Sequence, residues 1–256
     1  LTIAGFGTLV PAGLRPRIIN AGGAAASADT ASAPAGNRVG IEIRGLELTG
    51  STAGVGILAS GSALVSARVS ENEVVATGGN GISVGLGSTA AQDVAIHDNT
   101  VTATGTGILV QKSGAGSGTI TAFDDNVVTG NTGGVGIQVV GAAFDAVPGG
   151  AFQTVSGGST AVGVSGNGVG TSGIVLTTVG GDLACTDLDV YAEAGFGLSV
   201  SSTGAVNVAG GTGFRIAVGA GVGTIDANGG AAVSIQNASA NLPLAFLEST
   251  NSSTFG

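Results

Sequence analysis

The chain is poor in the residue types that most binding and catalytic sites use. Its 256 residues include no methionine, no tryptophan, one tyrosine, one histidine and one cysteine, and only 9% are charged. Cys185 cannot form a disulfide within the chain, so it is predicted to be a small buried apolar residue. Seven basic residues stand against a net charge of -9. Because nucleic acid binding depends on clustered Lys and Arg, a nucleic acid partner is disfavoured.

Other absences limit the fold class. The sequence has no apolar run of about 18 residues, so no membrane-spanning helix is predicted. Its 50 glycines follow no triplet period, which excludes collagen, and 43% hydrophobic residues argue against disorder. Residue 1 is not methionine and no signal peptide is visible. We therefore expect a processed or truncated piece of a longer secreted protein, extracellular or on a cell surface, and the scarcity of lysine and cysteine fits a bacterial one.

What the sequence does contain is a repeat. Asn72, Asn99 and Asn126 lie 27 residues apart in near-copies of one phrase, the first of which reads Val69-Ser-Glu-Asn-Glu-Val74. A fixed period of this length indicates a solenoid. The same column extends back to Leu46 and forward to Asn167 and Leu188.

A second column consists of a glycine followed by an aliphatic run. Its members are Gly56, Gly81, Gly107, Gly136, Gly173 and Gly197. Both columns lengthen in the same interval, which predicts a single insertion at about 141–159. The Ala/Gly/Ser-rich segment 20–38 is predicted to be a loop. Beyond residue 197 the spacing shortens, so either the coils narrow or half-coils are being counted.

Between these markers, short runs alternate apolar and polar residues, which is the pattern of strands. Coils of about 25 residues would place the aliphatic side chains inside, each above its equivalent in the next coil. The phrase resembles the repeat of the right-handed parallel β-helix superfamily, the pectate-lyase-like fold. We expect one all-β domain over residues 1–256, a right-handed parallel β-helix of about nine or ten coils. The superfamily includes lyases, hydrolases, phage spikes, adhesins and surface proteins, so the resemblance does not define an activity.

The asparagine column has a structural interpretation. An inward asparagine at a turn can bond backbone groups of the next coil, and stacked asparagines reinforce one another. We therefore predict a ladder of Asn72, Asn99, Asn126 and Asn167. Leu46 and Leu188 at the same place fit a position that lies inside.

One residue before this column stand Glu71, Asp98 and Asp125. Stacked strands would bring their carboxylates about 4.8 Å apart, where like charges repel. The residues are read either as a solvated acidic edge or as ligands of a calcium ion, which favours oxygen ligands. A glycosidase pair is disfavoured because the chain has few aromatic residues to position a sugar. His97 is expected to be an exposed turn histidine, and no catalytic residue is assigned.

The predicted insertion is the best place for specific recognition, because loops on a rigid scaffold often carry function. Phe144 and Phe152 could dock a partner chain or pack back on the solenoid. The function we expect is that of an extracellular structural or adhesive protein: a stalk, a passenger or a filament subunit. Self-association or a neighbouring chain is the expected partner, because uncapped strand edges pair readily. The alternative is a carbohydrate-active enzyme or polysaccharide-binding module.

Overall fold

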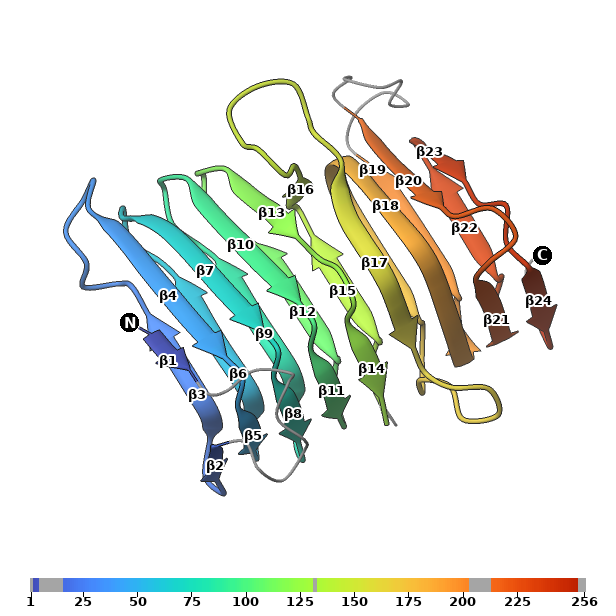
Figure 1. Ribbon diagram of the computed structural model, residues 1–256, viewed down its shortest axis with the longest axis horizontal. Helices are drawn as coiled ribbons and strands as arrows, with labels where there is room; N and C mark the ends of the chain where they lie inside the picture. Colours follow the sequence, from blue (N-terminus) through green and yellow to red (C-terminus); the bar gives the residue numbers. More distant parts are fainter. Residues whose placement is uncertain (1, 5–15, 131–132, 203–212, 253–256) are drawn as a thin grey trace.

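The computed structural model describes residues 2–4, 16–130, 133–202 and 213–252, and over these residues the chain is a parallel β-solenoid of about eight turns. The strands stack side by side along the long axis, with the two ends of the chain at opposite ends of the stack (Figure 1). The all-β β-helix prediction is confirmed, but the predicted nine or ten coils were too many. Gly213 and Gly230 precede strands on different faces of the solenoid, so the short spacing counted parts of one coil.

Each coil runs through three faces, which we number in chain order. Face 1 contains β1 (Thr2–Ala4), β4 (Arg38–Arg44), β7 (Leu64–Ser70), β10 (Gln92–His97), β13 (Gly118–Ala122), β16 (Ala143–Phe144), β20 (Phe214–Val218) and β23 (Ala238–Asn241). Face 2 contains β2 (Arg17–Asn20), β5 (Glu47–Gly50), β8 (Glu73–Ala76), β11 (Thr100–Ala103), β14 (Val127–Thr129), β21 (Thr224–Gly229) and β24 (Phe246–Thr250).

Face 3 contains β3 (Ala24–Asp29), β6 (Ala53–Ala59), β9 (Asn80–Leu86), β12 (Ile108–Lys112), β15 (Ile137–Val140), β19 (Leu198–Ser202) and β22 (Val233–Gln236). Two strands pass through corners without a break. β17 (Val155–Val162) runs from face 1 to face 2, and β18 (Ile174–Gly195) runs through all three faces. All the ladders are parallel, as winding in one direction requires.

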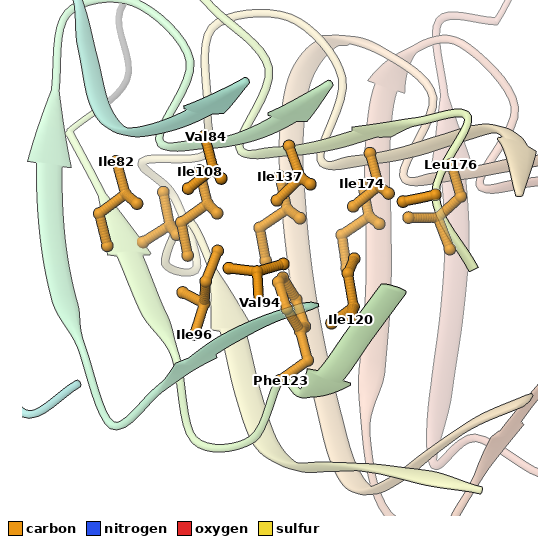
Figure 2. Close-up of a cluster of buried hydrophobic side chains, with 14 of the residues drawn as sticks. Ile82, Val84, Val94, Ile96, Ile108, Ile120, Phe123, Ile137, Ile174 and Leu176 are labelled. Atoms are coloured by element: carbon orange, nitrogen blue, oxygen red, sulfur yellow. The ribbon is translucent and has the colours of Figure 1, made fainter. Parts of the chain in front are cut away.

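The core is a set of aliphatic columns. On face 3 the register aligns Val55, Ile82, Ile108, Ile137 and Ile174, and each of these side chains is buried. Figure 2 shows several of these side chains in a row, facing Val94, Ile96 and Ile120 from face 1. Burying side chains of this size stabilises the fold by about 1.5–3 kcal/mol each, so the repeat period translates directly into a continuous core.

The glycine column marks the corner between faces 2 and 3. A Cβ added to Gly81 would lie 2.1 Å from Val101 Cγ1 and 2.6 Å from the Gly107 carbonyl oxygen. Gly136 and Gly173 meet the same obstruction from their own neighbours. The corner therefore excludes any side chain. In the first of these coils the register places Gly54 in the column, which corrects the prediction of Gly56: Val55, not Ile57, aligns with Ile82.

Two predicted irregular segments contain strands. The segment 20–38 was predicted to be a loop, but Ala24–Asp29 forms β3 and pairs with β6. Every second residue of β3 faces inward, as in the other strands, but here these residues are small alanines. The Ala/Gly/Ser-rich composition therefore resembled that of a loop.

The single predicted insertion at about 141–159 is also two separate features. A loop at 145–154 leaves face 1, and a turn closed by backbone hydrogen bonds between Val164 and Asn167 follows β17. Together they account for the lengthened spacing of both columns.

Candidate functional site

The first candidate site is the corner between faces 1 and 2, where the asparagine ladder lies. Asn72, Asn99 and Asn126 are each at most 1% exposed. Asn72 Nδ2 donates to Asn99 Oδ1 at 3.1 Å, and Asn99 Nδ2 donates to Asn126 Oδ1 at 3.1 Å. Each amide also donates to a backbone carbonyl of the preceding coil, at 2.9 Å in all three cases. The side chains thus replace the backbone hydrogen bonds that the corner cannot make.

Asn167 does not belong to this ladder, contrary to the prediction. It is exposed and lies in the turn that follows β17. The register instead places Thr160 after Asn126, because Val127 pairs with Ala161. Thr160 Oγ1 donates to the Gly157 carbonyl at 2.7 Å, much as Asn126 donates to Phe123. The two extra loops shifted the asparagine spacing, so the motif matched a residue outside the column.

The acidic residues before the ladder have a backbone role. Glu71, Asp98 and Asp125 have φ angles of 61°, 57° and 55°, and Gly45 holds the equivalent place with φ 69°. Asp and Asn tolerate this left-handed conformation better than most side chains, and glycine accepts it freely. The corner therefore selects these residue types before any ligand is considered.

The structure does not gather these three carboxylates, so the predicted calcium set is not assembled. Asp125 Oδ1 instead accepts a hydrogen bond from the Ser159 backbone N–H at 2.7 Å. Asp98 Oδ2 lies 2.7 Å from His97 Nδ1. Among the described residues, the cluster of three potential ligand atoms within 4.8 Å of one another is that of His97, Asp98 and Asp124. Asp98 and Asp124 are half-buried, and His97 is buried.

His97 was expected to be exposed, but it is only 9% exposed. It pairs with Ser70 in the register of face 1 and contacts Asp98. Its side chain therefore lies against the corner between faces 1 and 2 and is largely shielded from solvent. The sequence could not show this, because burial of a turn residue depends on its neighbours in the adjacent coils.

Phe144, one of the two aromatic residues predicted at the insertion, is part of the core. It is fully buried, and its ring centroid lies 5.9 Å from that of Phe123 and 5.5 Å from that of Phe214. Gly181 pairs with Phe144 on one side and with Phe214 on the other. Gly181 lies between them at φ 88°, where a Cβ would collide with the Phe144 backbone. Because Phe144 is fully buried, it packs on the solenoid and is not available to a partner.

Phe152 has a different position, because it lines a cleft beneath the 145–154 loop. The cleft has a volume of about 510 Å³, and its wall is rich in glycine. Lys112 and Asp145 also line it, together with Thr119 and Thr178. Lys112 is the only Lys or Arg between Arg68 and Arg215, but nothing in the sequence relates it to Phe152, so no signal in the sequence could have identified this cleft.

Asp145 holds the loop that covers this cleft. Its carboxylate is almost completely buried and accepts hydrogen bonds from the backbone N–H groups of Val147 and Gln153, at 3.2 and 2.9 Å. The loop is thereby closed at both ends by one side chain. Lys112 Nζ donates to the Gly114 carbonyl at 2.9 Å, which holds the ammonium group beside the cleft.

Cys185 is buried and has a free thiol, as predicted. Burial, with a contribution from the nearby charge of Asp187, raises the pKa of this thiol to about 12. A thiol that stays protonated at neutral pH is a poor nucleophile and a poor metal ligand. Cys185 is therefore a core residue.

Comparison with known proteins gives no match to a family model, to a curated protein or to a solved structure. In the described part of the chain, no helix has the length and apolar character needed to cross a bilayer.

Proposed function

We propose that this chain is an extracellular structural or adhesive protein, serving as a stalk, a passenger or a filament subunit on a bacterial cell surface. It would belong to the non-catalytic surface-protein type of right-handed, pectate-lyase-like β-helices. The observation that carries the proposal is that the inward-facing side chains stack on their equivalents in the neighbouring coils. Aliphatic columns and the asparagine ladder tie successive coils together along the described length.

The positions that first suggested chemistry support the same proposal. Glu71, Asp98 and Asp125 occupy left-handed turn positions, and the carboxylates of Asp98 and Asp125 contact separate partners. Phe144 belongs to the core. A scaffold of this kind favours mechanical continuity, since each coil is bonded to its neighbours by parallel ladders on three faces.

The expected partner is another protein chain, either a second copy or a neighbouring subunit. Strand β24 lies at the edge of face 2, and its Phe246 and Leu247 are 47% and 57% exposed. A strand edge with exposed apolar side chains favours pairing with a further strand, either from a continuation of the same polypeptide or from another chain.

Electron microscopy of the purified chain, combined with incubation on neutral and acidic polysaccharides, tests this function. We expect ordered assemblies or binding to surfaces, without cleavage of the polysaccharide. Release of new reducing ends without any assembly would overturn the proposal and favour an enzyme.

The cleft beneath the 145–154 loop supports a second candidate, a polysaccharide-binding or carbohydrate-active module. Phe152 offers an aromatic surface, and Lys112 offers a cation beside several hydroxyl groups. Replacing Phe152 with alanine should abolish polysaccharide binding if this candidate is correct. Phe196→Ala, which changes an exposed phenylalanine outside the cleft, is the matched control. Equal binding by wild type and Phe152→Ala would exclude the cleft as the binding site.

A further inference from the structure

Charged residues are distributed very unevenly over the three faces. Among the described strands, face 3 carries only Asp29, at the end of β3, and Lys112, at the end of β12. The strands of faces 1 and 2 carry Arg17, Arg38, Glu42, Arg44, Glu47, Arg68, Glu73, Asp93, Asp182, Asp187, Asp189, Glu193, Arg215, Asp226 and Glu248. In a chain with a net charge of -9, face 3 is therefore the surface that another copy can approach with least repulsion.

We propose that face 3 binds face 3 of a second copy of this chain, with the two solenoids side by side and antiparallel. The proposal rests on the structural function given above and names the surface through which the chain would associate with itself. A twofold axis parallel to the strands, between β12 and β15, brings the full length of both faces into contact. Such a contact is isologous, because the same surface is used by both copies.

The outward side chains of the two central columns of face 3 are all uncharged, so this operation brings no two charges together along them. In one column the register aligns Ser83, Leu109, Gln138 and Val175, so the axis places Leu109 opposite Gln138 and Ser83 opposite Val175 of the second copy. Ser83 leaves room for Val175, and Leu109 and Gln138, which are of similar length, pack side by side next to the axis.

The neighbouring outward column behaves in the same way. It aligns Leu58, Gly85, Gln111, Val140 and Thr177. Gly85 then faces Thr177 of the second copy, and Gln111 faces Val140. Leu58, which is 46% exposed, faces the serine-rich strand β19. Asp29 lies opposite the end of β22, which is uncharged.

The area of face 3 limits the expected affinity of the dimer. Eight strand segments at a spacing of about 4.8 Å, each about 13 Å long, give a flat area of about 500 Å² per copy. Stable interfaces bury about 800 Å² per partner, so we expect a weak dimer with a dissociation constant of about 10–100 μM.

Sedimentation equilibrium of the whole chain from about 5 to 500 μM tests the proposal, since this range brackets the expected affinity. The wild-type chain should dimerise, and added salt should strengthen the dimer because it screens the repulsion between two acidic copies. A chain that stays monomeric throughout would overturn the proposal, as would a dimer that salt dissociates.

Two matched substitutions locate the interface. Leu109→Lys places a charge from each copy next to the twofold axis and should weaken the dimer at least tenfold. Thr100→Lys, on the exposed surface of face 2 in the same coil, adds the same charge outside the interface and should change the affinity less than twofold. Melting temperatures close to that of wild type would show that both variants fold.

Equal effects of the two substitutions, or none from Leu109→Lys, would reject face 3 as the interface. Assemblies or adhesion that survive Leu109→Lys would leave the structural function standing while this inference fails. Cleavage of a polysaccharide by a monomeric chain would contradict both the structural function and the face 3 dimer.

Discussion

The two halves of the solenoid turn the same corner by different means. In the three coils that contain Asn72, Asn99 and Asn126, the strands stop at the corner between faces 1 and 2, a left-handed residue bends the chain, and the buried asparagine donates to backbone carbonyls. In the later coils, β17 and β18 run through the corner as continuous strands, with Thr160 and Leu188 at the ladder position. Leu46, which is buried beside Gly45 at φ 69°, shows that a sharp corner also accepts an apolar residue, so the asparagines serve chiefly to bond one coil to the next.

Asn99→Ala should produce the largest loss in this comparison. The variant removes donors to the Val69 and His97 carbonyls and to Asn126, and it removes the acceptor for Asn72. Several buried groups lose their partners together, so the free energy of unfolding should fall by about 3–5 kcal/mol. Urea denaturation, with hydrogen exchange to locate the affected coils, measures it. A loss below about 1 kcal/mol would show that the ladder is not what holds this corner.

Leu188→Asn tests whether the smooth corner can use a ladder residue. Leu188 is 1% exposed, and its neighbours in the column are Thr160 and Gly223. Neither neighbour has a side-chain amide that could pair with a new asparagine. We expect a loss of about 2–3 kcal/mol from burying an amide without the partners that Asn99 has. Denaturation measured in parallel with Leu188→Ala, which only creates a cavity, separates the two causes. If Leu188→Asn were as stable as wild type, the corner that β18 crosses would accept a buried asparagine as readily as the corners at Asn72, Asn99 and Asn126.

Thr160→Val should have a smaller effect, because it removes one hydrogen bond and keeps the shape of the side chain. The bond runs from Thr160 Oγ1 to the Gly157 carbonyl at 2.7 Å. Its loss should cost about 1 kcal/mol. A shift in the urea midpoint as large as that of Asn99→Ala would mean that Thr160 performs the full role of an asparagine.

The halves also differ in how they hold a carboxylate on face 1. Asp182 is bonded to Arg215 through two oxygens, whereas Asp93 is near Arg38 without a direct bond. Desolvation raises the pKa of Asp93 above 3.8, with Arg38 opposing the shift. A raised carboxylate pKa means that ionisation disfavours the folded state, so this contribution destabilises the protein as pH rises through the raised pKa.

Asp93→Asn should therefore be the mildest change and a stabilising one. The variant should melt higher than wild type at neutral pH, and the difference should vanish well below pH 3.8, where the wild-type carboxyl is protonated. Thermal melting across this pH range measures it, with Asp226→Asn on face 2 as the control. A difference that grows toward low pH would have the wrong sign and would contradict the assignment.

The sequence predicted the site less well than the fold. The period of 27 residues was enough to identify Asn72, Asn99 and Asn126 as neighbours, because repetition in sequence becomes contact in a solenoid. Asn167 failed because two loops displaced the phrase from the column, and Gly56 failed because the pattern was two residues out of register. The cleft beneath the 145–154 loop involves Lys112 and Phe152, which are 40 residues apart and share no motif.

The amino-acid sequence by itself determined the class of fold: its alternation, its period and its glycines admit parallel coils and little else. Only the tertiary structure decided which side chains share a surface. The concentration of charge on faces 1 and 2, the burial of Phe144 and His97, and the separate partners of Asp98 and Asp125 all depend on register between coils. The physical reason is that the period fixes which residues are near one another, while loops and corners fix where each side chain points.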